Sequence, residues 1–281
     1  MTAPSPAKGI LVLGRGRTGK TFITAHLAMA FNYLGAKTLV VGCDQKRDTL
    51  RAICEKTAPS LMEALETKDF GYSELDPAEV VVPISEYIDA MELGPSQLLS
   101  GHYGAVLDEA FHYFRVHRLL ERYRNVVYDV TDERFDGALA PLFRRAKSAI
   151  AVTDESVESL FVLNRLFRAS LIGGHELGYP VVILGVVNNR SRDTISFDRY
   201  VELTRCFPLL TIPALPELDH LRPFHRTLFA LKSLSPELAR IQDGFVKIAD
   251  MLRGDPMNLY PVTPLDDEEI WKLAPAVTLP S

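Results

Sequence analysis

Short apolar runs alternate along this chain with longer stretches in which apolar residues recur at helical spacing. The runs predict buried strands at residues 9–13, 38–42, 87–93, 126–130, 149–152, 181–187 and 209–212. The helical spacing predicts a first helix that ends near Gly35, and further helices at about 104–123, 137–147, 155–172, 195–205 and 235–252. Strands without polar alternation are buried on both faces. The pattern therefore predicts an α/β fold with a mostly parallel central sheet and helices on both of its faces.

The length and composition of the chain limit the number of domains that it can form. With 281 residues, 47% of them hydrophobic, the chain can bury one large core. We expect a flexible leader at 1–8, a single domain at 9–253 and a Pro-rich, acidic tail at 254–281. The tail holds the only tryptophan, Trp271, and its sequence leaves open whether it packs on the domain or serves as a docking peptide.

Charge and cysteine usage exclude several classes of protein. The net charge of −5 gives no overall attraction to nucleic acid, which is therefore not an expected partner. The chain has no C-x-x-C spacing among Cys43, Cys54 and Cys206, which excludes a disulfide framework and fits a cytoplasmic location. No apolar run reaches the roughly 18 residues of a membrane span, so we expect membrane contact only through a partner.

The junction between the first predicted strand and the first predicted helix holds the most specific motif. Residues 14–21, Gly-Arg-Gly-Arg-Thr-Gly-Lys-Thr, fill every fixed position of the G-x-x-x-x-G-K-[ST] phosphate-binding loop. Backbone N–H groups would converge on phosphate oxygens, Lys20 would neutralise the β- and γ-phosphates, and the Thr21 hydroxyl would bind Mg²⁺. The expected nucleotide-binding residues here are Gly14, Arg15, Gly16, Arg17, Thr18, Gly19, Lys20, Thr21 and Phe22.

Acidic residues follow two of the predicted strands at the edge where this loop would lie. Asp44 and Asp48 come after the second strand, and Asp129 ends the Walker B pattern Val-Val-Tyr-Asp. Such carboxylates can orient an attacking water or hold the water shell of the metal, and Asp44 is expected to contact Mg²⁺ through water. An acidic turn continues through Asp132, Glu133 and Asp136. Each aspartate taken singly could instead cap a helix.

Four motifs together resemble one known family. They are residues 14–22, Val-Gly-Cys-Asp44-x-Lys-x-Asp48-Thr, Met91-Glu-Leu-Gly-Pro95 and Val-Tyr-Asp129-Val, in this order. They are similar to the nitrogenase iron protein family, and most of all to the iron-protein subunit of chlorophyllide reductase, over about residues 8–267. The resemblance implies a single P-loop NTPase domain of the deviant Walker A type, similar to MinD, that binds ATP or ADP with Mg²⁺ as a homodimer. In this family two subunits share one [4Fe-4S] cluster and pass electrons to a catalytic partner.

The resemblance also implies roles for residues outside the loop. Asn189 and the segment near Pro213 would contact adenine. The segments 44–48 and 129–136 would be the two switches that respond to hydrolysis.

Two substitutions relative to the family bear on hydrolysis. Arg15 stands where the family has a lysine that reaches the nucleotide of the other subunit, and Glu133 stands where it has an aspartate. Because both side chains differ in geometry from the family pattern, we expect slow ATP hydrolysis. The residues expected to take part in it are Lys20, Asp44, Glu133 and Arg15.

The chain departs from the family where the cluster would be bound. The two positions that carry cluster cysteines in the family are His102 and Asp136 here, and none of the three cysteines falls at either. Imidazole and carboxylate are not the soft ligands that such a cluster needs, so we expect no [4Fe-4S] cluster. A harder ion, bound by His102 and Asp136 from two subunits, is an alternative.

These observations predict a Mg-ATP-dependent dimeric switch without a cluster, which acts in the assembly, regulation or scaffolding of a partner complex. The resemblance suggests photosynthesis and bacteriochlorophyll enzymes as its setting. One alternative is a reductase component that delivers electrons to a tetrapyrrole reductase, and this requires a redox centre. Another is a ParA- or MinD-like ATPase positioned on DNA or membrane. The arginine-rich stretch at 111–124 favours the latter weakly, whereas the acidic balance opposes it.

Overall fold

An eight-stranded sheet forms the centre of the molecule. The computed structural model describes residues 7–44, 46–54, 56–99, 103–130, 140–176, 182–192, 194–221, 226–254 and 262–273. Within them the strand order is β3-β4-β2-β5-β1-β6-β7-β8, and every pairing is parallel except that of β3 with β4. The strands are β1 (Lys8–Gly14), β2 (Thr38–Gly42), β3 (Val82–Pro83), β4 (Ile88–Glu92), β5 (Asn125–Asp129), β6 (Ala146–Thr153), β7 (Val182–Ser191) and β8 (Pro208–Pro213).

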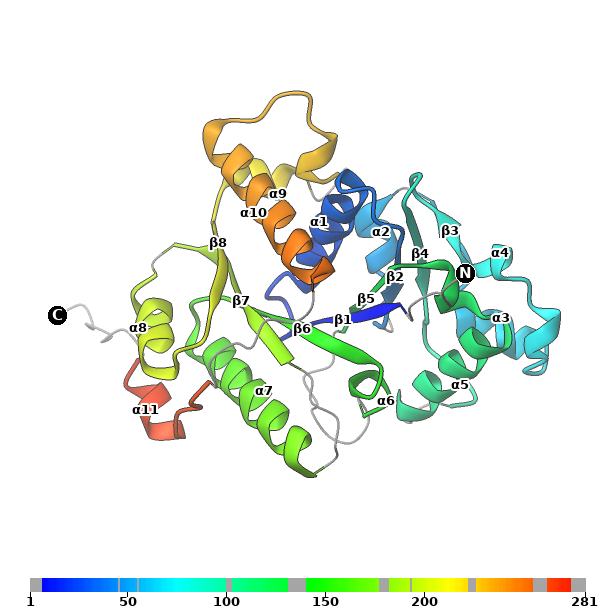
Figure 1. Cartoon of the computed structure of the whole chain (residues 1–281), viewed down its shortest axis with the longest axis horizontal. Coiled ribbons are helices and arrows are strands. Elements are labelled where there is room, and N and C mark those ends of the chain that lie inside the picture. The colour runs from blue at the N-terminus through cyan, green and yellow to red at the C-terminus, as the bar shows by residue number, and fades with distance from the viewer. Residues whose placement is uncertain are drawn as a thin grey trace.

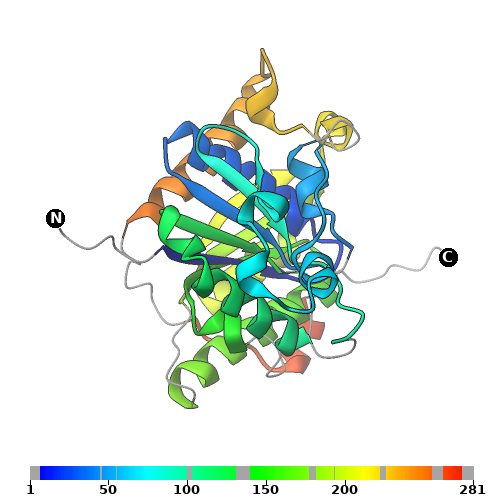
Figure 2. The same cartoon turned by 90° about the vertical axis from the view of Figure 1, so that its right-hand side faces the viewer.

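Helices cover both faces of this sheet (Figures 1 and 2). The longer ones are α1 (Lys20–Tyr33), α5 (Tyr103–Val116), α7 (Val157–Glu176), α8 (Ile195–Thr204) and α10 (Pro236–Arg253). The shorter ones are α2 (Thr49–Ile53), α3 (Leu61–Thr67), α4 (Pro77–Val80), α6 (Ala140–Phe143), α9 (Pro216–Leu221) and α11 (Asp267–Trp271), with 3₁₀ turns η1 (Tyr72–Glu74), η2 (Leu119–Arg122) and η5 (Leu228–Ala230). The predicted α/β fold, with a mostly parallel sheet between two helical layers, is confirmed.

Alternate side chains of β1 enter the two hydrophobic cores. Ile10 and Val12 belong to the core shared with α1 and α10, whereas Leu11 and Leu13 belong to the core shared with α5 and α7. Successive residues of a strand point to opposite faces of a sheet. Because both faces of β1 are covered, the strand requires apolar residues at every position, which explains the continuous apolar run in the sequence.

Two predicted helices differ from the structure. The helix predicted at 104–123 ends at Val116, because Arg118 takes a left-handed φ of 46° and the chain continues into η2. The helix predicted at 137–147 is wrong in its second half, since β6 begins at Ala146 and pairs with Gly9 of β1. Pairing with a buried strand outweighs the local helical pattern there. Residues 131–139 lie outside the described part of the chain.

The short helices between β2 and β4 have no counterpart among the predicted elements. α3 begins with a capping box, in which Ser60 Oγ accepts from the Glu63 N–H and the Glu63 carboxylate accepts from the Ser60 N–H. α4 begins with a similar arrangement of Asp76 and Glu79. The sequence carries both signals, Ser-x-x-Glu and Asp-x-x-Glu, although these helices are too short to show periodicity.

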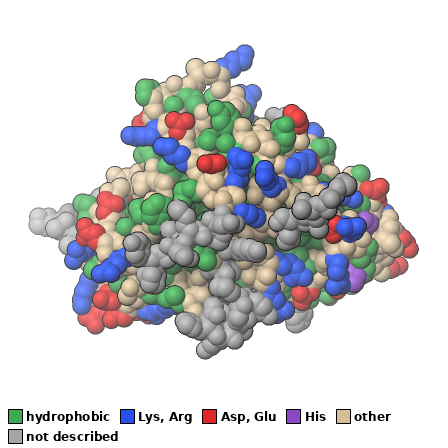
Figure 3. Space-filling view, viewed as in Figure 1, with side chains coloured by type: hydrophobic (Ala, Val, Ile, Leu, Met, Phe, Trp, Pro, Cys, Tyr) green, Lys and Arg blue, Asp and Glu red, His purple; other side chains and the backbone are tan. Residues whose placement is uncertain are grey.

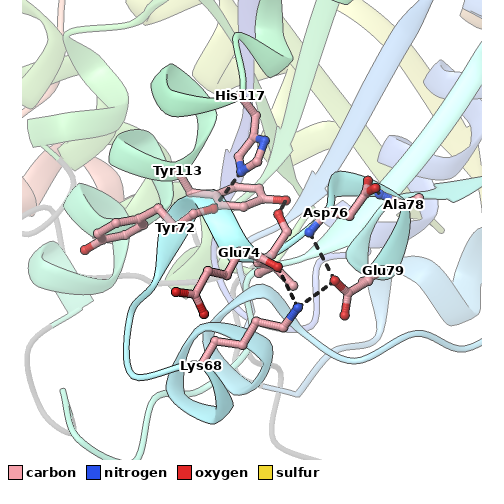
Figure 4. A network of polar contacts seen from close by, with 9 residues as sticks. Lys68, Tyr72, Glu74, Asp76, Ala78, Glu79, Tyr113 and His117 are labelled. Carbon is pink, nitrogen blue, oxygen red and sulfur yellow. Dashed lines mark hydrogen bonds and ion pairs between the residues drawn. The ribbon is translucent and has the colours of Figure 1, made fainter.

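A polar network ties this region to α5 (Figure 4). Lys68 Nζ donates to the Glu79 carboxylate at 2.7 Å and to the Glu74 carbonyl oxygen at 2.8 Å. The Tyr113 hydroxyl, from α5, donates to the Leu75 carbonyl oxygen at 3.2 Å. The α3–α5 network comprises Lys68, Tyr72, Glu74, Asp76, Glu79, Tyr113 and His117.

The part of the predicted tail that the structure describes, residues 262–273, packs on the domain. Asn164 of α7 is buried, and its amide donates to the Leu265 carbonyl oxygen and accepts from the Leu265 N–H, both at 2.8 Å. In α11 Ile270 is fully buried, and Trp271 packs edge-on against Phe161 of α7 with ring centroids 5.1 Å apart. These contacts hold α11 against α7 (Figure 1).

Candidate nucleotide-binding site

The turn between β1 and α1 adopts backbone conformations that glycine allows. Gly14 has a φ of 152° and Gly19 a φ of 91°, a region that side chains disfavour. A Cβ atom at Gly14 would also overlap a carbonyl oxygen of β6. Thr18 closes the turn, since its N–H and its hydroxyl both donate to the Arg15 carbonyl oxygen, at 3.4 and 2.8 Å. α1 starts at Lys20, so the positive end of the helix dipole lies at this turn.

A cavity of about 620 Å³ opens beside the loop. Its size lies in the range of roughly 300–1,000 Å³ that is typical of small-molecule sites. Lys20 is almost fully buried in its wall, and Nζ donates to the Arg15 carbonyl oxygen at 2.8 Å. The predicted residues that line the cavity are Gly16, Arg17, Gly19, Lys20, Thr21, Phe22, Asp44 and Asp48.

Sequence reasoning missed several residues of the lining. Those residues include Arg51, Arg190 and Arg226. With Arg17, Lys20 and Lys46, they give the described lining six cationic side chains against two carboxylates, a balance that suits a polyanion such as a triphosphate. The sequence could have indicated Arg190 as a lining residue, because it directly follows Asn189, a predicted site residue.

His26 is a further lining residue that was not predicted. Its Nδ1–H donates to the Phe22 carbonyl oxygen at 2.8 Å, and Nε2 accepts from the Leu228 N–H at 3.1 Å. Burial lowers the pKa of His26 to about 4, so the ring is neutral near neutral pH. His26 lies four residues after Phe22, a predicted site residue, and therefore on the same face of α1. This spacing could have indicated His26 as a lining residue.

Asp44 and Asp48 follow β2, and both line the cavity. Asp44 Oδ1 accepts from the Lys46 N–H at 3.0 Å, which fixes the turn after the strand. Asp48 Oδ1 is buried and has no hydrogen-bond partner among the described residues. Burial, and next the charge of Asp44, raise the pKa of Asp48. A buried carboxylate oxygen without a partner, next to a phosphate loop, is suited to a hydrated cation.

Asp129 ends β5, opposite Val12 of β1 and Gly42 of β2. It is fully buried, and its Oδ2 accepts from the Thr49 hydroxyl at 2.8 Å, whereas Oδ1 lacks a partner in the described structure. Burial raises the pKa of Asp129 to about 6, although hydrogen bonding by Thr49 and by Thr21 and the charge of Lys20 act in the opposite direction. The loop, Asp48 and Asp129 thus meet at one edge of the sheet, and together they fit a Mg-nucleotide.

Asn189 and Pro213 come together from β7 and β8. Both line a small hollow that adjoins the main cavity at Phe22. Asn189 is buried, and its Nδ2 donates to the Thr18 carbonyl oxygen of the loop at 2.7 Å. Asn189 therefore connects the phosphate loop to the position where the resemblance places adenine.

The remaining predicted residues divide into two groups. Arg15 provides its carbonyl oxygen to the loop, and its side chain is not part of the described cavity lining, whereas that of Arg17 is. Glu133, His102 and Asp136 lie outside the described residues.

Two of the three cysteines, Cys43 and Cys206, lie far apart in the sheet. Cys43 follows β2 and Cys206 precedes β8, and four strands separate β2 from β8 in the sheet. Both thiols are buried, and burial raises the pKa of each, which disfavours the thiolate that binds iron. Cys54, which follows α2, is half-buried. Cys43 and Cys206, buried at separate strands, do not lie together as the pair of thiolates that each subunit would supply to a shared [4Fe-4S] cluster. Among the described residues no three His, Cys, Asp or Glu side chains form a group that could hold a metal ion.

The sheet, the glycine-dependent loop at its carboxyl edge and the buried Asp129 define a P-loop NTPase fold. A model of the family "4Fe-4S iron sulfur cluster binding proteins, NifH/frxC family" matches residues 8–279, and the chain belongs to this family. The family resemblance seen in the sequence is thereby confirmed.

Named relatives agree with this assignment. The chain is 32% identical over 267 residues to the light-independent protochlorophyllide reductase iron-sulfur ATP-binding protein of Halorhodospira halophila, covering 95% of this chain and 88% of the relative. It is 31% identical to the protein of the same name from Methylorubrum populi, with 92% and 87% covered. The chain is thus homologous to ATP-binding subunits of reductases.

Solved structures of nucleotide-bound proteins share the fold. The ATP complex of a Cyanothece McdA variant superposes with a TM-score of 0.65 at 18% identity, covering 87% of this chain and 96% of that one. MinD from Pyrococcus horikoshii, complexed with Mg-ADP, gives 0.64 at 17% identity, with 90% and 99% covered. The MinD-like fold predicted from the sequence is confirmed. No helix in the described ranges is long and apolar enough to cross a membrane.

Proposed function

We propose that this chain is a Mg-ATP-dependent dimeric switch that works without an iron–sulfur cluster and acts on a partner complex. The observation that carries the proposal is the phosphate loop with buried Lys20, which opens on a cavity of about 620 Å³ that Asp44 and Asp48 also line. The names of the relatives, which contain "ATP-binding", favour ATP as the nucleotide.

The residues of the site have separable tasks in this proposal. The N–H groups of residues 15–21 bind phosphate oxygens, and Lys20 leaves the Arg15 carbonyl oxygen to donate to the β- and γ-phosphates. Thr21 binds Mg²⁺, and Asp44 and Asp48 hold its water shell. Bound Mg²⁺ shields the charge of the phosphates. Asn189 and Pro213 bind the base.

Hydrolysis is slow in this proposal. Asp44 and Glu133 orient the water, and Arg15 reaches the nucleotide of the second subunit. The longer Glu133 side chain and the planar guanidinium of Arg15 are less well matched to this reaction than the family residues. A long-lived ATP state then lets the segments 44–48 and 129–136 present an altered surface to a partner.

The placement of the cysteines supports the absence of a cluster. Two of the three thiols are buried in the core, and the family's cluster positions carry His102 and Asp136. The chain then cannot deliver electrons itself, so assembly, regulation or scaffolding of a partner complex is the role that remains. The names of the relatives favour tetrapyrrole reductases as the setting of that complex.

A positioning ATPase on DNA or membrane is the second candidate, because the chain shares its fold with the septum site-determining protein MinD. The arrangement of the basic side chains opposes this second candidate, because acidic side chains lie among them. Lys and Arg side chains gather near the middle of the face in Figure 3, with Asp and Glu among and around them. On α5 and η2, Arg118 donates to Glu121 at 2.9 Å and Arg115 bonds to His112 at 2.8 Å, as expected of a solvated face.

The test is performed on anaerobically purified full chain, as wild type and as Lys20→Ala. We expect wild type to bind Mg-ATP, Lys20→Ala to lose this binding, and neither to contain iron or sulfide in stoichiometric amounts. Iron and acid-labile sulfide at about two atoms per chain, half of a shared cluster, would establish the reductase alternative instead. ATP-dependent co-sedimentation with DNA or liposomes would favour the positioning ATPase.

A further inference from the structure

Glu92 ends β4 and is almost fully buried, at 3% exposure. It pairs in register with Gly42 of β2, whose missing side chain leaves space for the Glu92 carboxylate. A Cβ atom at Gly42 would overlap Glu92 Oε2 and would lie 2.8 Å from Thr49 Cβ. The carboxylate therefore crosses the end of β2, where Oε1 accepts from the Leu50 N–H of α2 at 2.6 Å.

α2 is thus held by carboxylates from the strands on either side of β2. Leu50 is bonded to Glu92 of β4, and the preceding Thr49 is bonded to Asp129 of β5. Neither carboxylate is part of the described cavity lining, but Asp129 interacts with Thr21 and Lys20 of the phosphate loop, whereas Glu92 lies one strand further out, on β4. α2 therefore connects the nucleotide site to a residue outside it.

The chain after Glu92 is tied to the same strand end. The Leu93 N–H donates to the Gly42 carbonyl oxygen at 2.8 Å, and the Tyr103 hydroxyl donates to the Cys43 carbonyl oxygen at 2.8 Å. Within this segment, residues 93–99, Leu98 is 72% exposed and offers apolar surface to a partner.

We propose that Glu92 is a positioning residue that couples the nucleotide site, through α2, to the surface segment 93–99. The inference rests on the proposed ATP-binding function and adds the route by which it reaches the surface. Mg-ATP changes the environment of Asp129 and Thr49, α2 shifts, and the Glu92 carboxylate transmits this shift to residues 93–99. Its Oε2 has no hydrogen-bond partner in the described structure, so the carboxylate can change its bonding as α2 moves. Because coupling is reciprocal, a ligand bound to residues 93–99 changes the affinity for ATP by the same factor.

Two conservative variants separate the hydrogen bond from the charge. Glu92→Asp keeps the charge but is one methylene too short to reach the Leu50 N–H. Glu92→Gln loses the charge but keeps an oxygen that can accept this bond. A merely structural role would change the stability of the variants without separating the responses of the two segments.

Amide hydrogen exchange of the full chain, with and without a non-hydrolysable ATP analogue and Mg²⁺, provides the measurement. In wild type and Glu92→Gln we expect the analogue to slow exchange in both 47–54 and 93–99, by about fivefold or more. In Glu92→Asp we expect residues 47–54 to respond as in wild type and residues 93–99 to lose their response.

Three outcomes would overturn the inference: no response of residues 93–99 in wild type, an unchanged response in Glu92→Asp, or a loss in Glu92→Gln equal to that in Glu92→Asp. Each is distinct from failure of the proposed function. In that case the analogue would not bind wild type at all, and residues 47–54 would not respond either.

Discussion

The carboxyl edge of the sheet and the α3–α5 network are both polar, yet their groups differ in pairing. At the sheet edge Asp48, Glu92 and Asp129 each keep a buried oxygen without a hydrogen-bond partner in the described structure. In the network, Lys68 and Tyr113 have their partners within reach (Figure 4). A buried carboxylate without a partner costs stability, so folds retain it mainly where a ligand or a movement requires it. The difference supports the proposed nucleotide site at the sheet edge and favours a structural role for the network.

The largest expected effect is on ATP affinity, and it is tested by replacing one lysine in each region with alanine. Lys20→Ala removes the ammonium from the phosphate loop, and we expect ATP affinity to fall about 100-fold, since a hydrogen bond to a charged group contributes roughly 1.5–3 kcal/mol. Lys68→Ala, its counterpart in the network, should leave ATP affinity within about twofold of wild type. Equilibrium titration with a fluorescent ATP analogue compares them. Equal losses in both variants would contradict the division between the regions.

Two glycines extend the comparison to the backbone. Gly14→Ala places a Cβ against a β6 carbonyl oxygen, so we expect it to lower the free energy of unfolding by about 2–3 kcal/mol and to impair ATP binding. Gly35→Ala should lower it by only about 1 kcal/mol, because Gly35 has a φ of 64° but a Cβ there would meet nothing closer than Tyr87 Cζ at 3.9 Å. Urea unfolding and ATP titration of both variants measure the difference. Normal ATP binding by Gly14→Ala would mean that the loop conformation is not required.

The burial of Glu92 predicts a pH dependence of stability. Burial raises the pKa of Glu92 to about 7, so the folded state binds a proton that the unfolded state releases near pH 4.5. Stability therefore falls as pH rises from about 4.5 to about 7. Glu92→Gln should be more stable than wild type by on the order of 1–2 kcal/mol at pH 8, and the gain should vanish near pH 4.5.

Urea unfolding in EDTA without nucleotide, at both pH values, measures this gain. A gain that is the same at both pH values would show that the charge of Glu92 is not its cause.

The smallest effect is expected in the network. Tyr113→Phe removes the hydroxyl that donates to the Leu75 carbonyl oxygen, and we expect the unfolding free energy to fall by about 1 kcal/mol. ATP affinity should not change, because the network does not reach the cavity. A change in ATP affinity in this variant would show that the network and the nucleotide site are energetically coupled, which contradicts the division between the two regions.

The sequence predicted those parts of the site that depend on local pattern. β2 was predicted at residues 38–42 as observed, and the loop and Asp129 came from motifs with fixed spacing. Glu92 could not be predicted as a site residue, because its role depends on the pairing of β4 with β2 and on the absence of a side chain at Gly42. The start of β6 at Ala146 was missed for a similar reason, since only its pairing with β1 makes that stretch a strand.

The packing of residues 262–273 on α7 has a consequence for how the chain matures. Synthesis delivers α7 and α8 well before residues 262–273, so the apolar surface around Asn164 stays uncovered while the intervening chain is made. During this interval Asn164 has neither of its Leu265 partners. A ribosome that stalls within α10 would therefore release a product whose phosphate loop is complete but whose exposed α7 surface invites chaperones or proteases.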